Sequence, residues 1–157
     1  MPLPVPALRA VLAASAGLLT ATAATPAAAA PPAPPNCVVV LDTATVTCYA
    51  TRAGLRAAVD RLDRTAASSD LGAVWSDGHG GGSQLLFRGS QGCAFRYPEF
   101  RTLPAGWNDV ASSATGYGGC RIYLYEHTYW QGIFRYADGF VGDLNNFNDR
   151  TSSVHFS

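Results

Sequence analysis

The feature that most constrains this sequence is a pair of short patterns, each of which occurs twice. Residues 107–113 read WNDVASS and residues 147–153 read FNDRTSS, so an aromatic residue followed by N-D-x-x-S-S recurs after 40 residues. Before the second copy, residues 125–132 (YEHTYWQG) place two aromatic residues five positions apart and a glycine two positions later. Residues 75–82 (WSDGHGGG) repeat this spacing, with glycine at the second aromatic position. The repetition indicates a domain built from two equivalent units.

The composition places this domain in the C-terminal half of the chain. Sixteen of the 17 aromatic residues and 14 of the 16 glycines lie in residues 71–157. Residues 84–87, 121–125 and 133–136 are short and rich in β-prone side chains, and Gly, Asp and Asn clusters separate them. This spacing predicts an all-β sandwich or barrel.

Both halves carry the two patterns in the order found in a known family. Residues 71–157 resemble a βγ-crystallin domain, whose two Greek keys each have a Y/F/W-x-x-x-x-Y/F/W-x-G hairpin and an N/D-N/D-x-x-S/T-S motif. The resemblance implies an all-β fold in which two Greek-key motifs, at about 71–118 and 119–157, form a βγ-crystallin-type sandwich. The expected export and disulfides are also similar to the secreted bacterial branch of metalloproteinase (peptidase) inhibitors.

The same resemblance implies two calcium sites with crossed ligands. One motif supplies a backbone carbonyl and the hydroxyl at its fifth position, the other supplies an Asn or Asp side chain, and a hairpin carbonyl completes each sphere. Calcium takes six to eight such oxygen ligands. The candidate ligand residues are Asn108, Asp109, Val110, Ser112, Asn148, Asp149, Arg150, Ser152, Glu126 and Ser76.

The motifs also allow a purely structural interpretation. Asn-Asp and Ser-Ser could form an Asx turn that leads into a strand, and Ser113 and Ser153 are expected to hold the hairpins rather than contact metal. Asp109 and Asp149 are the only acidic residues within the motifs. Because affinity falls with ligand charge, the expected dissociation constants are on the order of 10⁻⁴ to 10⁻³ M.

The N-terminal residues have the pattern of an export signal. Residues 1–30 contain a single charge, Arg9, then an apolar run and small-residue A-x-A sites at 28–30 and 21–23. This pattern predicts a secretory signal peptide. The apolar run is too short, and too interrupted by Thr and Ser, to span about 30 Å of hydrocarbon. The protein is therefore expected to be secreted and extracellular, with no membrane span.

The residues between signal and β-domain form a separate region in this interpretation. Residues 31–36 are a Pro-rich spacer, and residues 37–70 form an N-terminal disulfide-tied hairpin plus a short helix and linker. Apolar residues at helical spacing predict the helix over 54–64. Residues 65–70 are the expected linker, and the β-domain covers 71–157.

The four cysteines predict two disulfide bonds. An even number in an oxidising compartment indicates pairing, and four cysteines allow three connectivities. We expect the local connectivity, Cys37–Cys48 and Cys93–Cys120, because residues 38–47 read as a hairpin that brings the first pair together. A metal–thiolate site is the rival interpretation, and the lack of a Cys-x-x-Cys spacing opposes it.

Charge and titratable residues exclude several functional classes. The formal net charge of +0 argues against a nucleic-acid-binding surface, which needs basic residues to release counterions. His79, His127 and His155 are not at ligand spacing and are interpreted as surface or strand residues. The β-domain offers no nucleophile-elbow signature and no evident pair of acid and base, so we expect no enzyme.

The sequence leaves three functional hypotheses. The first, which the resemblance implies, is a metalloproteinase inhibitor that binds an extracellular protease; the stretch around residues 94–97 is the place to look for the contact, and no inhibitory residue is carried over from the family. The second is a calcium-binding extracellular stress or surface protein without inhibitory activity. The third is a killer-toxin-like or carbohydrate-binding module that uses exposed aromatic residues, although Trp107, Tyr125, Trp130 and Phe147 are expected in the core. In each case we expect a monomer.

Overall fold

The computed structural model describes residues 32–65, 67–93 and 101–157. These residues belong to one compact unit, Pro31–Ser157. The predicted signal peptide lies outside the described residues, and so do residues 94–97, on which the inhibitor hypothesis depends.

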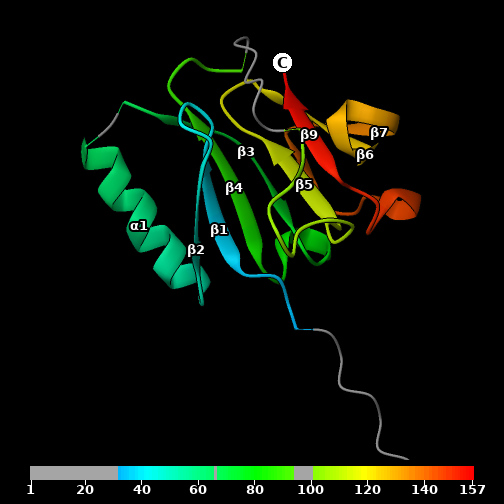
Figure 1. The fold of residues 1–157 in the computed structure, drawn as a ribbon, viewed down its shortest axis with the longest axis horizontal. Helices are drawn as coiled ribbons and strands as arrows, with labels where there is room; N and C mark the ends of the chain where they lie inside the picture. Colours follow the sequence, from blue (N-terminus) through cyan, green and yellow to red (C-terminus); the bar gives the residue numbers. More distant parts are fainter. Residues whose placement is uncertain (1–31, 66, 94–100) are drawn as a thin grey trace, which may run out of the picture. The chain divides into compact units, whose positions relative to one another are not determined.

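The described chain forms two β-sheets and one α-helix (Figure 1). Sheet A has the strand order β2-β1-β4-β3-β5-β8 and sheet B the order β7-β6-β9. The strands of sheet A are β1 (Asn36–Val40), β2 (Thr45–Tyr49), β3 (Ser69–Trp75), β4 (Gln84–Gly89), β5 (Ser113–Gly116) and β8 (Phe140–Val141). The strands of sheet B are β6 (Arg121–His127), β7 (Gln131–Asp138) and β9 (Ser153–Phe156). The 3₁₀ turns are η1 (Gly78–Gly80), η2 (Thr128–Trp130) and η3 (Asn145–Phe147).

The strand order is that of two interlocked Greek keys. In the first half β5 returns to pair with β3, and in the second half β9 returns to pair with β6, so the last strand lies beside the first in each. Strand β8 of the second half leaves its own sheet and pairs with β5 of the first. The predicted all-β sandwich of two Greek keys is confirmed.

The space between the sheets holds the main hydrophobic core. Both motif aromatics are buried there: Trp107 is 0% exposed and Phe147 is 1% exposed. The indole Nε1 of Trp107 donates a hydrogen bond of 3.0 Å to the carbonyl of Pro35. Tyr125 and Trp130 depart from the expected core position and are only partly buried. On β6 the inward side chain is that of Leu124, and alternation along the strand turns Tyr125 to the opposite face.

The predicted N-terminal hairpin is present and extends sheet A. Strands β1 and β2 pair antiparallel with Cys37 opposite Cys48, and a disulfide joins the two. The second disulfide joins Cys93 to Cys120, so the predicted connectivity is confirmed. Strand β1 also pairs parallel with β4. The hydrogen-bonded sheet therefore continues across the domain boundary expected near residue 71.

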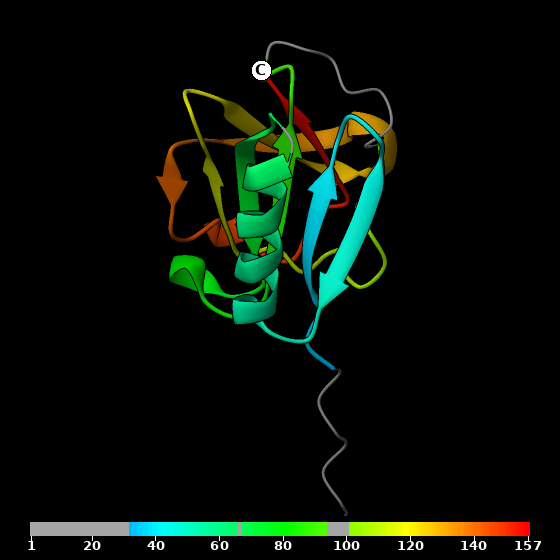
Figure 2. The ribbon, with the colours of Figure 1, turned by 90° about the vertical axis from the view of Figure 1, so that its left-hand side faces the viewer.

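Helix α1 (Arg52–Thr65) covers the outer face of sheet A, as Figure 2 shows. Leu55, 1% exposed, packs with Val38 of β1, Ala73 of β3 and Leu86 of β4 in a second apolar cluster. Val59 and Leu62 pack against the same cluster. Sheet A is thus covered on both faces, by the inter-sheet core and by the helix.

A buried arginine joins the helix to the sheet. Arg88 of β4 is 3% exposed, and its guanidinium forms ion pairs with Asp63 of α1 and, at 2.6 Å, with Asp70 of β3. Burial raises the pKa of Asp70, while the Arg88 charge opposes that rise. Removing one partner of such a pair leaves an uncompensated buried charge, which lowers the free energy of unfolding.

The connection from helix to β-domain is shorter than expected. The helix ends at Thr65 and β3 begins at Ser69, so Thr65, Ser69 and Asp70 of the predicted linker 65–70 belong to these two elements. At the other end of the helix, the Thr51 hydroxyl accepts a hydrogen bond of 3.1 Å from the Gly54 amide, as an N-cap side chain does. Within the described ranges, no helix is long and apolar enough to cross a membrane.

Replacement of Leu55 by alanine tests the packing of the helix on sheet A. Deleting a buried leucine side chain removes apolar contacts and leaves a cavity, so Leu55→Ala is expected to lower the free energy of unfolding by about 2–5 kcal/mol. Urea denaturation would measure the loss. The control Val46→Ala, at a residue that is 38% exposed on β2, is expected to cost about 1 kcal/mol or less. Equal effects of the two substitutions would contradict the described packing.

Candidate functional site

The two N-D-x-x-S-S motifs meet face to face. Asp109 and Asp149 both adopt left-handed backbone conformations, with φ of 56° and 55°. The Asp109 amide donates a hydrogen bond of 2.9 Å to the Thr151 carbonyl, and the Asp149 amide donates one of 3.0 Å to the Ala111 carbonyl. Because the paired residues occupy equivalent motif positions, the two halves are related by an approximate two-fold arrangement.

The last serine of each motif holds a hairpin. The Ser113 hydroxyl donates to the Asp77 carbonyl at 2.7 Å and accepts from the Gly80 amide at 3.0 Å. The Ser153 hydroxyl makes the matching pair of bonds to the His127 carbonyl, at 2.6 Å, and from the Trp130 amide, at 3.1 Å. Ser113 and Ser153 are thus structural, as the sequence predicted.

The glycines of the hairpin pattern combine a left-handed backbone with side chains packed close to their Cα atoms. Gly82 has a φ of +65°, and a Cβ atom on it would lie 2.1 Å from the Ser76 Oγ. Gly132, its counterpart, has a φ of +81°, and a Cβ atom there would lie 2.9 Å from a ring carbon of His127. A side chain at either position would clash with the hairpin that carries a candidate ligand.

The second oxygen cluster contains groups from both halves. The Ser152 hydroxyl donates to the Glu126 carbonyl at 2.8 Å and lies 3.2 Å from Asp109 Oδ1, which belongs to the first motif. Asp109, Glu126, Arg150 and Ser152 line a shared cavity of about 300 Å³, together with Asp149. The crossed contribution implied by the family resemblance is therefore present as geometry.

The first oxygen cluster is the counterpart but is less complete. The Ser112 hydroxyl lies 3.3 Å from Asp149 Oδ1 of the second motif. The Ser112 amide is fixed by a hydrogen bond of 2.8 Å to the Trp75 carbonyl, next to Ser76. The Ser76 hydroxyl accepts from the Ser83 amide at 2.9 Å and lies 3.1 Å from Asp77 Oδ1.

The two asparagines of the motifs bond to neighbouring carboxylates. Asn108 Nδ2 donates to Asp109 Oδ2 at 2.6 Å, and Asn148 Nδ2 donates to Asp143 Oδ1 at 3.2 Å. The side-chain oxygen of Asn148 is buried and accepts no hydrogen bond from the described residues. The asparagines orient acidic groups here, and Asn148 retains an unused oxygen.

An ion pair distinguishes the second cluster from the first. The Arg150 guanidinium bonds to the Glu126 carboxylate and lowers the pKa of Glu126. The first motif has the neutral Val110 at the corresponding position. Sequence reasoning considered Arg150 only for its backbone carbonyl and missed this charge, although the residue type itself was a sufficient signal.

Neither cluster is rich in carboxylates. Across the part of the chain that the structure describes, no group of three or more His, Cys, Asp or Glu side chains is placed to hold a metal ion. The donors brought together in the two clusters are mainly hydroxyl and carbonyl oxygens with one motif aspartate each. Such a set fits a hard cation and has no nitrogen or sulfur ligand for a transition metal.

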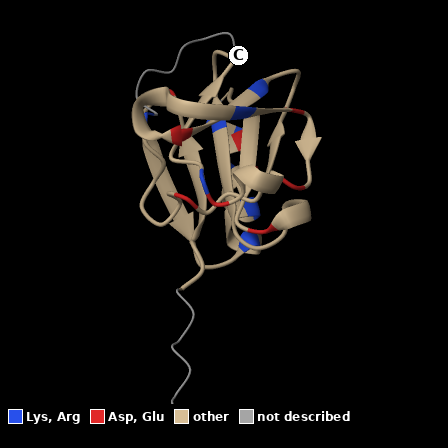
Figure 3. Ribbon diagram, turned by 90° about the vertical axis from the view of Figure 1, so that its right-hand side faces the viewer, with Lys and Arg blue, Asp and Glu red and all other residues tan. Residues whose placement is uncertain are grey.

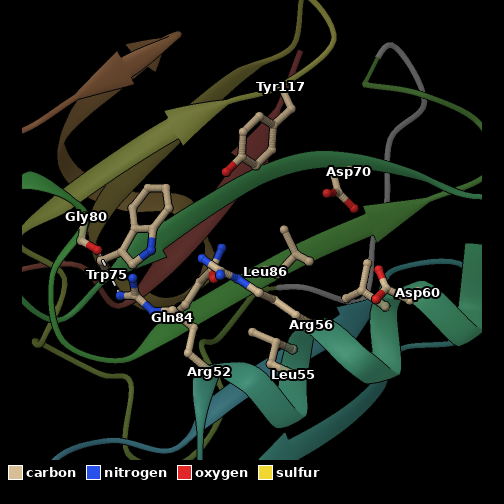
Figure 4. Close-up of a pocket in the computed structure, with 11 residues that line it drawn as sticks. Arg52, Leu55, Arg56, Asp60, Asp70, Trp75, Gly80, Gln84, Leu86 and Tyr117 are labelled. Carbon is tan, nitrogen blue, oxygen red and sulfur yellow. Dashed lines mark hydrogen bonds between the residues drawn. The ribbon is translucent and has the colours of Figure 1, made fainter.

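A separate groove that the sequence did not indicate lies between α1 and sheet A (Figure 4). It has a volume of about 420 Å³, and Trp75, Leu86 and Tyr117 line its sheet side. On the helix side, Arg52 donates hydrogen bonds of 2.8 Å and 2.6 Å to the carbonyls of Gly80 and Gly82. The groove contains none of the candidate ligands.

The comparisons with known proteins concern the fold alone. No protein-family model and no curated protein matches the chain. Similar solved structures include the N-terminal domain of protein S, with 17% sequence identity, a TM-score of 0.42, and coverage of 57% of this chain and 96% of that one. A βγ-crystallin domain from Clostridium beijerinckii has 17% identity and a TM-score of 0.43, and covers 55% and 95%. A variant of clostrillin in complex with nickel has 18% identity and a TM-score of 0.44, and covers 56% and 98%.

Replacement of Glu126 by glutamine tests the ion pair through its pH dependence. The folded pKa of Glu126 is lowered from 4.5. A carboxyl with a lowered folded pKa stabilises the protein above its unfolded pKa, and this contribution is lost as pH falls through the folded value. We expect Glu126→Gln to melt below the wild type at pH 7, and the gap to close as the pH falls through the lowered pKa of Glu126 in the folded protein. A gap that persists at the lower pH would contradict the assignment.

Proposed function

We propose that this chain is an extracellular, non-enzymatic calcium-binding domain of the βγ-crystallin type, in which weakly bound calcium strengthens the sandwich. The observation that supports this most directly is the crossed pair of oxygen clusters, Ser152 with Asp109 and Ser112 with Asp149. In each pair the hydroxyl and the carboxylate come from different halves. An ion bound between them would link the two Greek keys.

The ligand sets follow from these contacts. The proposed second site uses the Ser152 hydroxyl, the Asp109 carboxylate and the Glu126 carbonyl, and the hydroxyl lies within hydrogen-bonding distance of both other groups. The Arg150 carbonyl is its fourth proposed ligand. The proposed first site uses the equivalent groups of Ser112, Asp149, Ser76 and Val110. Water completes the oxygen sphere that calcium requires.

The charge of the sites sets the expected affinity. Each proposed site has one motif carboxylate, and the second also has the Arg150 guanidinium nearby, paired with Glu126. A positive side chain repels a divalent cation. The proposed dissociation constants are therefore on the order of 10⁻⁴ to 10⁻³ M, a range suited to extracellular calcium.

The extracellular location rests on two supports. Residues 1–30 have the composition of an export signal. The structure contains the disulfides Cys37–Cys48 and Cys93–Cys120, which persist in oxidising compartments. The protease-inhibitor hypothesis stays a prediction from the sequence, because residues 94–97 lie outside the described residues.

Thermal unfolding with added calcium tests the proposal. Calcium that binds only the folded state stabilises it by mass action, so 10 mM calcium at a dissociation constant near 1 mM contributes about 1.4 kcal/mol per site. We expect the melting temperature of the wild type to rise with added calcium. The double variant that combines Asp109→Asn and Asp149→Asn is expected to show no such rise. The control Asp60→Asn, outside the motifs on α1, is expected to keep the rise. A melting temperature unaffected by millimolar calcium would sink the proposal.

Replacement of Arg150 by glutamine tests the charge at the second site. The substitution keeps the backbone carbonyl, removes a positive charge and frees the Glu126 carboxylate. We expect calcium affinity at this site to increase several-fold, because a like charge near the ion is removed. Isothermal titration calorimetry would measure the change. Arg135→Gln is the matched control, since Arg135 bonds to Asn146 outside the motifs; an Arg150→Gln affinity no higher than this control would contradict the assigned role.

A further inference from the structure

The outer face of sheet B differs from that of sheet A. Helix α1 covers the outer face of sheet A and buries an apolar cluster, whereas the exposed face of sheet B carries aromatic rings that no helix covers in the described residues. Phe134 and Tyr136 of β7 are 52% and 54% exposed. Figure 3 views the molecule from this side, with basic segments in blue and acidic segments in red.

The strand register arranges these rings in rows. Tyr123 of β6 lies between Tyr136 of β7 and His155 of β9, and Tyr125 lies beside Phe134. The ring centroid of Tyr123 is 6.0 Å from that of Tyr136 and 6.1 Å from that of His155, and the Tyr125–Phe134 distance is 5.5 Å. These five rings, with Trp130 at 5.5 Å from His155, form the aromatic face.

Adjacent rings are connected diagonally as well. Tyr123 also contacts Phe134, at 5.8 Å. Rings at such spacings support one another through edge-to-face and tilted contacts. The aromatic face is therefore a continuous, mutually supported surface across neighbouring strands rather than a set of isolated exposed side chains, and contiguous exposed patches of this kind mark interaction sites.

Polar and charged groups surround the rings, and two of them form a balanced ion pair. Arg121 forms an ion pair of 2.7 Å with Asp138 across β6 and β7, and its guanidinium lies 4.8 Å from the centroid of the Tyr136 ring. Ser157 and Arg121 near the Tyr123 hydroxyl lower its pKa. The rim thus offers polar groups for hydrogen bonding, with Arg101 over the Trp130 ring as a further cation rather than the cluster of basic residues that a polyanion needs.

We propose that the aromatic face binds a neutral polysaccharide of β-1,4-linked hexopyranose units. In the β-1,4-linked glucose and N-acetylglucosamine units of cellulose and chitin the ring substituents are equatorial, so each ring has an apolar C–H surface and a polar rim. The C–H hydrogens are attracted to the negative π-faces of aromatic rings. The hydroxyls match Arg121, Asp138 and the tyrosine hydroxyls. This chemistry combines the two properties of the face, ring planes and a polar border without a cluster of basic residues.

The charge of the face distinguishes this ligand from other partners. A nucleic acid or an anionic lipid surface would gain little from an arginine that Asp138 already neutralises. A second copy of the chain would also bury the rings, and this is treated as an outcome of the test. The inference is independent of the calcium sites, since none of the six face residues is a proposed ligand.

Retention on insoluble polysaccharides tests the proposal. The protein is incubated with microcrystalline cellulose and with chitin, and its bound fraction is compared with that on a non-carbohydrate resin. The test variant combines Phe134→Ala and Tyr136→Ala, both at exposed positions. The control is Phe140→Ala, because Phe140 is 59% exposed and contacts Trp75 rather than the aromatic face. Circular dichroism and thermal melting establish that each variant is folded.

The expected result is retention of the wild type and the Phe140→Ala control on at least one polysaccharide. The double variant should bind about ten-fold more weakly or worse, and soluble cello- or chito-oligosaccharides should compete. Failure of the wild type to bind either matrix above the resin would overturn the proposal. Binding that the double variant retains would overturn it as well, as would a concentration-dependent dimer, seen by sedimentation, that the double variant abolishes.

Discussion

Two backbone hydrogen bonds hold the halves of the sandwich together at the position of the candidate sites. They run from Asp109 to Thr151 and from Asp149 to Ala111, and each takes its donor from one Greek key and its acceptor from the other. Both aspartates must adopt a left-handed backbone, which Asp and Asn tolerate better than most other residues. This conformation places the side chain of each aspartate beside the serine of the opposite motif. Without this exchange, the hydroxyls and carboxylates would belong to two unrelated turns.

Much of this arrangement could be predicted from the sequence, because its requirements are local. The repeated glycine and serine positions constrain the residue type. A Cβ atom on Gly82 would clash with its neighbours, and the Ser113 hydroxyl bridges two backbone groups of the hairpin tip. The disulfide Cys37–Cys48 could likewise be predicted, because a short hairpin brings its cysteines together. Each of these features depends on residues that are close in sequence or repeated at a fixed spacing.

The features that were missed depend on long-range pairing. No local pattern specifies that β1 pairs with β4, or that Arg88 is buried against Asp63 and Asp70. The burial of some aromatic residues was predicted wrongly for the same reason. Aromatic content indicates a core, but strand alternation and the placement of the helix decide which rings are inside, and on sheet B they leave Tyr125 and Phe134 on the outer face.

The hairpin of β1 and β2 gives the chain an order of assembly. Its disulfide closes a loop with a sequence separation of 11, whereas the hydrogen bond from Trp107 to Pro35 spans 72 residues. Closing a short loop costs less entropy than closing a long one, so the hairpin can form before the sandwich does. Once formed, it docks on β4, so that β2 rather than β4 is the edge strand of sheet A. The N-terminal extension therefore replaces the edge of β4 with the edge of a disulfide-closed hairpin.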